Sequence, residues 1–213
     1  MTLPDGWHPV ALAHNIEPGT STGTRIDGVE LVVWRDVSGR IHVWDDRCPH
    51  RGMKMSFGFV RGDHIACLYH GWQYDTAGQC RLIPARPDLK VPEAIRIGTY
   101  PAIEKGGVVW TCHREGEEPP DLDEAIPVRS LYVDRDASSL AADLTARGAR
   151  SLHDRVCQLP IGEESARIAM QSINEAATAL HIVVDKQAGR DARMGQRTVS
   201  AWAQRYRLEA ETR

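Results

Sequence analysis

The sequence lacks long hydrophobic runs and carries little net charge, and both absences restrict what the protein can be. Its 213 residues contain no apolar stretch approaching the ~20 residues of a membrane helix. The formal net charge is only −3, so neither nucleic acid nor an anionic membrane is expected as a partner. Residues 1–10 are polar and include Pro4 and Pro9, so we expect no signal peptide there.

Cysteine is scarce and odd in number, which argues against a disulfide framework. Of the five cysteines, two belong to the motifs described next. The other three are expected to be buried or free thiols in a reducing cytoplasm. They are Cys80, Cys112 and Cys157.

Two short runs each pair one thiol with one imidazole. Residues 48–52 read Cys-Pro-His-Arg-Gly, and residues 67–72 read Cys-Leu-Tyr-His-Gly-Trp. Sixteen residues separate His50 from Cys67. Thiolates prefer soft metals, and imidazoles prefer borderline metals. The repeated pairing of Cys with His therefore predicts a metal centre with two sulfur and two nitrogen ligands. Because both runs repeat the order Cys, His, Gly, a chance match is a poor explanation.

Two kinds of metal centre have this donor set. In a Rieske [2Fe–2S] cluster, two Cys hold one iron and two His hold the other. A structural zinc ion also binds two Cys and two His, usually as pairs separated by about two to four residues. A single residue separates Cys48 from His50, which is tight for one ion and suits ligands that reach different irons. The spacing favours the cluster and leaves zinc as the alternative.

The two runs resemble those of the Rieske family, and the resemblance covers roughly residues 6–114, about half of the chain. Their form is similar to the oxygenase branch, particularly to vanillate-type O-demethylases and methylxanthine N-demethylase systems. The resemblance implies a Rieske [2Fe–2S] cluster as cofactor. It further implies that Cys48 and Cys67 hold an inner iron while His50 and His70 hold an outer one, which would make the imidazole edge the electron exit.

The resemblance also implies supporting roles for five residues around the ligands. Gly52 and Gly71 lack side chains, so their backbone can approach the cluster, although turn geometry alone would also explain them. Pro49 would stiffen the first loop. Tyr69 and Trp72 would shield the cluster from water.

The residues around the second loop suggest a low reduction potential. Respiratory Rieske proteins carry an extra Cys in each loop, and this chain has Met53 and Tyr69 at those places. Trp72 stands where those proteins have a Ser that hydrogen-bonds the cluster. We therefore expect a potential nearer roughly −150 mV than +300 mV.

Residues 1–115 predict a mainly β Rieske domain, sandwich-like, with antiparallel sheets and two cluster-binding hairpin loops. Strands at 29–35 and 41–44 flank a turn at 36–39, and a later hairpin turns at 104–107. Residues 116–127 are acidic and Pro-rich, which is typical of a linker.

Residues 128–213 predict a small α+β domain. The expected elements are a strand at 128–133, a helix from Asp136 to near Gly148, a strand pair at 166–171 and 179–184, and a closing helix. The closing helix would present one face made of Val199, Trp202, Tyr206 and Ala210.

The second half has few histidines for an oxygen-activating iron, which in this family is held by two His and one carboxylate. Only His153 and His181 lie beyond the linker, 28 positions apart, whereas the resemblance implies two His a few residues apart. We expect His181 to be a hydrogen-bonded core residue and His153 a surface one. The domain is interpreted as a reduced relative of the helix-grip domain.

These observations predict a Rieske-type electron-transfer component with no catalytic residue of its own. It would carry single electrons from a flavin-dependent reductase to a non-haem iron oxygenase or demethylase, and it would not be an oxygenase by itself. One alternative is a fragment or divergent form of a terminal Rieske oxygenase. The other is a structural zinc-binding interaction module. The sequence leaves open the substrate and whether the protein is a homo-oligomer.

Overall fold

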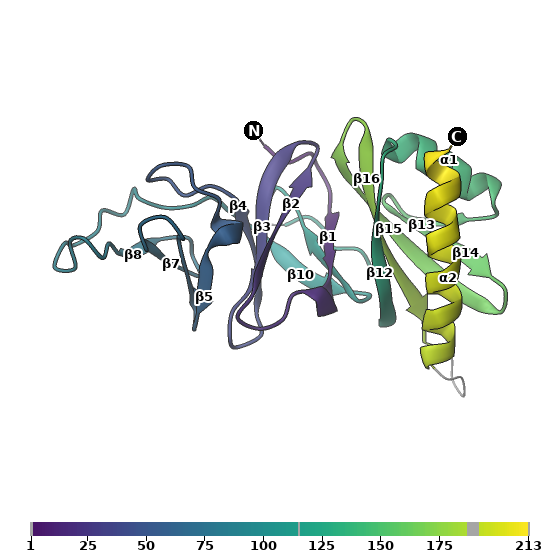
Figure 1. Cartoon of the computed structure of the whole chain (residues 1–213), viewed down its shortest axis with the longest axis horizontal. Helices are drawn as coiled ribbons and strands as arrows, with labels where there is room; N and C mark the ends of the chain where they lie inside the picture. Colours follow the sequence, from purple (N-terminus) through teal and green to yellow (C-terminus); the bar gives the residue numbers. More distant parts are fainter. Residues whose placement is uncertain (1, 115, 187–191, 213) are drawn as a thin grey trace.

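The computed structural model describes residues 2–114, 116–186 and 192–212. Over these ranges the chain forms four antiparallel sheets, two α-helices and two short 3-10 helices. Figure 1 shows them in a row, with the small strands β5, β7 and β8 at one end and the two helices at the other. No helix among the described residues is long and apolar enough to cross a membrane.

The first half contains three sheets, in agreement with the predicted β domain. One sheet has the order β1 (His8–Leu12), β11 (Val108–Thr111), β10 (Ala102–Lys105). The second has the order β2 (Ser21–Ile26), β3 (Val29–Arg35), β4 (Ile41–Asp45), β9 (Thr99–Tyr100). The third has the order β5 (Phe59–Arg61), β6 (His64–Ala66), β7 (Gln73–Asp75), β8 (Cys80–Leu82). The 3-10 helices are η1 (Ala13–Asn15) and η2 (Met55–Phe57).

The second half is one five-stranded sheet with two helices. Its order is β12 (Ala125–Val133), β16 (Ala177–Asp185), β15 (Glu164–Asn174), β14 (Val156–Ile161), β13 (Arg150–His153). The helices are α1 (Ala137–Ala146) and α2 (Ala192–Glu211). Strand β12 begins at Ala125, so the last three residues of the expected linker pair with β16.

Most local elements of this half follow the sequence pattern. Asp136 caps α1, because its carboxylate accepts a hydrogen bond from the Ser139 amide at 2.9 Å. Helix α2 buries Val199, Tyr206 and Ala210 of the predicted face against the sheet, whereas Trp202 is only partly buried and Ala203, which was not predicted, is buried instead. Strands β13 and β14 were not predicted; β14 contains Pro160, which lacks an amide donor and obscures the pattern.

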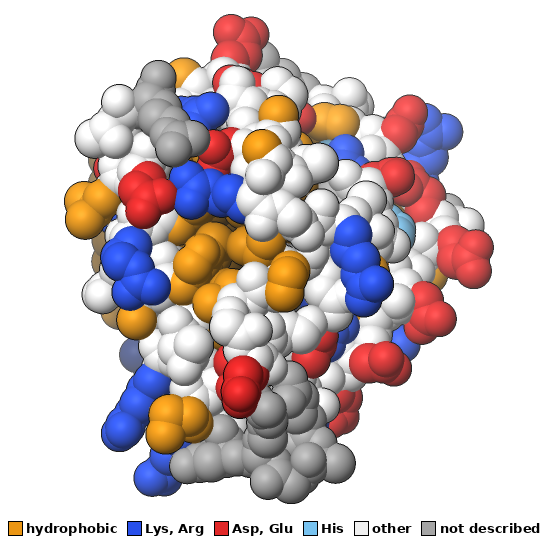
Figure 2. Space-filling view, turned by 90° about the vertical axis from the view of Figure 1, so that its right-hand side faces the viewer, with side chains coloured by type: hydrophobic (Ala, Val, Ile, Leu, Met, Phe, Trp, Pro, Cys, Tyr) orange, Lys and Arg blue, Asp and Glu red, His pale blue; other side chains and the backbone are white. Residues whose placement is uncertain are grey.

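The helix-covered end faces solvent with a mixed surface. Figure 2 shows this end, where hydrophobic side chains gather in a hollow among Lys, Arg, Asp and Glu. Exposed large apolar side chains on the elements of this half include Leu152, Met194 and Leu208.

The two halves share a hydrophobic core. Trp7 and Trp110 from the first half pack with Val156, Ala169 and Val183 on the five-stranded sheet. The helices α1 and α2 cover the opposite face of that sheet, where Leu140, Leu144 and Tyr206 pack. The five-stranded sheet is therefore buried on both faces and joins the halves firmly.

A buried polar chain also crosses the junction. His181 lies on β16. Its Nδ1 is 2.8 Å from the Ser130 hydroxyl oxygen, and its Nε2 is 2.7 Å from the Gln171 amide oxygen. The Gln171 nitrogen donates to Thr24 Oγ1 at 2.7 Å and to the Arg25 carbonyl at 2.8 Å. For every group to be satisfied, His181 must be neutral and donate from Nε2. This confirms the prediction that His181 is a hydrogen-bonded core residue.

This burial predicts a pH dependence of stability. Desolvation lowers the pKa of His181 from 6.5 to about 4. Between these values the unfolded chain binds a proton that the folded chain does not, so stability is full above pH 6.5 and declines as the pH falls. The expected loss by pH 4 is roughly 3 kcal/mol from this group. The measurement is urea unfolding from pH 7.5 to pH 4.

His181→Gln is the matched variant for this experiment. It should be less stable at pH 7.5 and should show a shallower pH dependence than the parent protein. Burial also lowers the pKa values of His8 and His42. The stability of both the parent protein and His181→Gln should therefore still decline to some extent as the pH falls. Equal slopes in the two proteins would contradict the assignment.

Candidate metal centre

The two motif loops close by the same backbone turn. The Cys48 amide donates to the Met53 carbonyl at 2.8 Å, and the Gly52 amide donates to the Cys48 carbonyl at 2.8 Å. In the second loop the Cys67 amide donates to Trp72 at 2.9 Å and the Gly71 amide to Cys67 at 3.0 Å.

Both turns need glycine at the fifth position. Gly52 has φ +71° and Gly71 has φ +68°, a left-handed conformation that glycine adopts without the steric cost of a Cβ. The turn explanation of these two glycines is therefore sufficient by itself.

The turns place the two thiols inside the protein and the two imidazoles at its surface. Cys48 is 2% exposed and Cys67 is 3% exposed. Burial, and then the neighbouring Cys48, raise the pKa of the Cys67 thiol. His50 is half-buried and His70 is exposed, and their ring centroids are 4.6 Å apart. The structure thus arranges the four predicted ligands as two pairs, a buried sulfur pair and an accessible imidazole pair.

Aromatic side chains hold the imidazoles. Trp72 stacks on His50 with centroids 4.2 Å apart and planes within 9°, and Tyr69 stacks on His70 at 3.8 Å. Trp72 is half-buried, but Tyr69 is 57% exposed, so Tyr69 supports one face of its histidine and remains open to water. Stacking fixes the ring orientation of both candidate ligands.

Tyr74 contacts the site although the sequence did not suggest it. Its hydroxyl lies 3.2 Å from the Cys48 sulfur, and its side chain is fully buried on β7. Burial raises the pKa of Tyr74, so the phenol stays protonated and can donate to a thiolate sulfur. The available signal was the alternation of β7, in which only Tyr74 of its three residues is buried.

The charges around the first loop are mixed. Arg47 and Arg51 are exposed, whereas Lys54 is paired with Glu30 at 2.7 Å. Desolvation, followed by the charges of His70 and Arg51, lowers the pKa of His50, which favours the neutral imidazole that binds metal.

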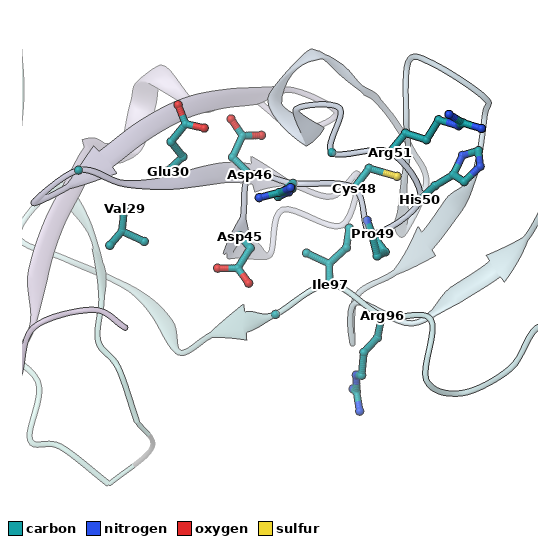
Figure 3. A pocket seen from close by; sticks show the side chains of 14 residues that line it. Val29, Glu30, Asp45, Asp46, Cys48, Pro49, His50, Arg51, Arg96 and Ile97 are labelled. Carbon is teal, nitrogen blue, oxygen red and sulfur yellow. The ribbon is translucent and has the colours of Figure 1, made fainter. Parts of the chain in front are cut away.

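A cavity of about 760 Å³ adjoins this loop. Figure 3 shows Cys48 and Pro49 at one side of it and the carboxylates of Asp45 and Asp46 at another. These carboxylates are held internally, by the Tyr100 hydroxyl at 2.7 Å and by Ser56 at 2.7 Å.

The donor set fits a cluster better than a single ion. Among the residues that the structure describes, no three His, Cys, Asp or Glu gather around one point. The candidate ligands lie instead as two pairs, and a phenol is placed to donate to one sulfur. Two pairs, one of thiols and one of imidazoles, suit the two different irons of a Rieske cluster.

Comparison with known families agrees with this geometry. The family model of the Rieske [2Fe-2S] domain matches residues 6–97. This segment is a Rieske domain. Its cofactor is a Rieske-type [2Fe–2S] cluster, which makes the zinc alternative unnecessary.

Curated relatives include an oxidoreductase and several oxygenase components. Oxidoreductase NdmD of Pseudomonas putida is 34% identical over 141 residues, which are 65% of this chain and 24% of that protein. The oxygenase component of 3-ketosteroid-9-alpha-monooxygenase from Rhodococcus rhodochrous is 36% identical over 132 residues, covering 61% of this chain and 34% of the relative. The chain therefore spans only a quarter to a third of the length of these relatives.

Solved structures extend the likeness of fold to both halves. NdmA of Pseudomonas putida CBB5 with caffeine has a TM-score of 0.76 at 17% identity, covering 97% of this chain and 81% of that one. Dicamba monooxygenase bound to dicamba has a TM-score of 0.80 at 17% identity, covering 100% and 87%. At these identities the likeness shows the fold alone.

The two histidines of the second half are kept apart. His153 lies on β13 and His181 on β16, with β14 and β15 between them. Three strand spacings amount to about 14 Å, too far for two ligands of one iron. Both ring nitrogens of His181 are also engaged with Ser130 and Gln171.

Tyr74→Phe should lower the reduction potential while leaving the cluster bound. A hydrogen bond to a cluster sulfur stabilises the reduced, more negative state, so its loss favours the oxidised state. A difference of about 1 kcal/mol corresponds to roughly 40 mV for one electron. A redox titration followed by absorbance measures it; an unchanged potential would contradict the role of the phenol.

His70→Cys should convert the spectrum toward that of an all-cysteine cluster, with a much lower potential of roughly −400 mV, or abolish cluster binding. The EPR spectrum of the reduced protein distinguishes these outcomes from the parent. His64→Cys is the matched control, because His64 lies on β6 outside both loops, and it should keep the parent spectrum. A parent-like spectrum for His70→Cys would exclude His70 as a ligand.

Proposed function

We propose that this chain is an electron-transfer component of a Rieske oxygenase or demethylase system. Cys48 and Cys67 hold one iron of the cluster, and His50 and His70 hold the other. The protein takes single electrons from a flavin-dependent reductase and delivers them to a non-haem iron oxygenase. The main support is the accessible imidazole pair, in which His70 is exposed and His50 half-buried; it gives a partner access to one side of a site whose thiols are buried.

The surface next to this pair suits a transient contact. Leu68 is 47% exposed and Tyr69 57% exposed, so apolar area lies directly beside His70. Arg47 and Arg51 add positive charge on the first loop, which would attract an acidic partner and speed its approach. A small, partly apolar patch with charged neighbours matches the short-lived complexes typical of redox partners.

The second half supports the carrier more than an oxygenase. We propose that the Rieske domain spans residues 1–115 and that residues 128–213 are a reduced helix-grip domain without its iron, joined by residues 116–127. The separation of His153 from His181 favours this interpretation. The fold likeness over both halves to dicamba monooxygenase keeps a divergent terminal oxygenase as the second candidate.

We place the carrier in the cytoplasm. None of the five cysteines forms a disulfide, as expected in a reducing compartment.

Reconstitution tests the proposed function. The cluster-loaded protein is mixed with NADH, a flavin-dependent reductase and an oxygenase whose own Rieske ligands have been replaced. We expect rapid reduction of the cluster and product formation that depends on this chain. Cys48→Ser, which should lose the cluster, is the control that should abolish product.

Metal analysis separates the two candidates. The carrier should contain two irons and two sulfides per chain. Iron beyond two per chain together with product formed without an added oxygenase would establish the terminal oxygenase instead. Failure of the reduced protein to pass electrons to any cluster-free oxygenase would contradict the carrier.

A further inference from the structure

The bases of the two motif loops are closed in different ways. The second loop lies at the tip of a hairpin, where Ala66 at the end of β6 pairs with Gln73 at the start of β7. The hydrogen bonds between these strands hold the two ends of that loop together. The first loop differs, because β4 ends at Asp45 and the next strand, β5, belongs to another sheet. Its ends are held by side chains instead.

Asp46 and Ser56 join the two ends of the first loop, and we call this pair the clasp. The Asp46 carboxylate accepts one hydrogen bond from the Ser56 amide at 2.7 Å and another from the Ser56 hydroxyl at 2.7 Å. The clasp encloses residues 47–55, which include Cys48 and His50. Asp46 is only 3% exposed, so water competes little for these bonds. Hydrogen bonds to an ionised acceptor are also among the stronger ones in proteins.

The clasp is anchored to the scaffold at both of its residues. The Asp46 amide donates to the Glu30 carbonyl on β3 at 3.1 Å. The Ser56 carbonyl accepts a hydrogen bond from the Ser21 hydroxyl on β2 at 3.3 Å. Because β2 and β3 are neighbours in one sheet, the base of the first loop is fixed relative to that sheet.

Gly23 on β2 leaves room for the clasp. A Cβ at this position would lie 3.0 Å from the Ser56 hydroxyl oxygen and 3.4 Å from a carboxylate oxygen of Asp46. Crowding of this kind would force Ser56 to shift. Gly23 does not have a positive φ, so its backbone conformation is open to other residues. The space that the clasp needs therefore explains a glycine at this position.

We propose that the clasp is a positioning device for the first ligand loop of the cluster. By holding the loop ends together, it keeps Cys48 beside the Tyr74 hydroxyl and keeps His50 stacked on Trp72. Groups that hold metal ligands in place affect how tightly the metal is retained. This role is independent of which protein exchanges electrons with the cluster.

Iron release from the cluster-loaded protein into excess EDTA tests the clasp, and the absorbance of the cluster follows it. Ser56→Ala removes one clasp hydrogen bond and should release iron about fivefold faster than the parent. Asp46→Ala removes both and should release iron about tenfold faster or more. Asp46→Asn keeps an acceptor for the Ser56 amide and should restore most of the parent rate. Parent-like release by Ser56→Ala would overturn the proposal, whether or not Asp46→Ala folds.

Asp136→Ala is the matched control for a general loss of stability. The Asp136 carboxylate also accepts from a backbone amide, that of Ser139 at 2.9 Å, and from a serine hydroxyl, that of Ser138. These bonds lie at the start of α1 in the second half. Asp136→Ala should therefore be less stable than the parent and should release iron at the parent rate. Acceleration equal to that of Ser56→Ala would overturn the proposal.

Crowding the clasp tests it without removing either partner. Gly23→Val places a larger side chain against the Ser56 hydroxyl and should speed iron release, as Ser56→Ala does. Thr22→Val is the matched control, because neighbouring side chains on a strand point to opposite faces of the sheet. It should release iron like the parent. Parent-like release by Gly23→Val, or equal acceleration by Thr22→Val, would overturn the proposal.

The EPR spectrum after reduction by dithionite gives a second readout that needs no partner protein. In Ser56→Ala, Cys48 and His50 should take a wider range of positions, so the cluster signal should be shifted or broadened. Asp136→Ala should keep the parent spectrum. A parent spectrum for Ser56→Ala would overturn the proposal.

Discussion

Each cysteine carbonyl in the two motif loops accepts a hydrogen bond from a glycine four residues later, and each cysteine amide donates to the residue after that glycine. These paired turns direct Cys48 and Cys67 inward while His50 and His70 remain at the surface. Everything at the metal centre depends on this geometry. The stacking of Trp72 and Tyr69 then fixes the rings, and the buried phenol of Tyr74 reaches the sulfur from the core side.

The inside and outside of the site have different consequences. On the buried side, low polarity and one hydrogen bond to sulfur adjust the potential at which an electron is held. On the exposed side, the histidines lie beside apolar Leu68 and Tyr69, where a partner can approach.

The second half is attached to the Rieske domain through a shared core and a polar chain. Trp7 and Trp110 contribute to the core, and Gln171 connects His181 with Thr24. These contacts engage both ring nitrogens of His181 in hydrogen bonds within the protein.

The sequence by itself determined the features that depend on local spacing. The positions of Cys48 and His50 predicted the kind of centre, because one intervening residue limits which metals both side chains can reach. The hairpin at 29–44, the cap at Asp136 and the buried face of α2 follow from turn chemistry and periodicity, which act over a few residues.

Only the tertiary structure decided the contacts between distant segments. Tyr74 reaches Cys48 across 26 positions, and Gln171 reaches Thr24 across 147. Strands β13 and β14, and the start of β12 at Ala125, depend on pairing with neighbouring strands in the sheet. The residue pattern of one strand carries little information about such pairing. Whether a buried charge finds a partner is likewise a matter of packing, because the partner can come from any part of the chain.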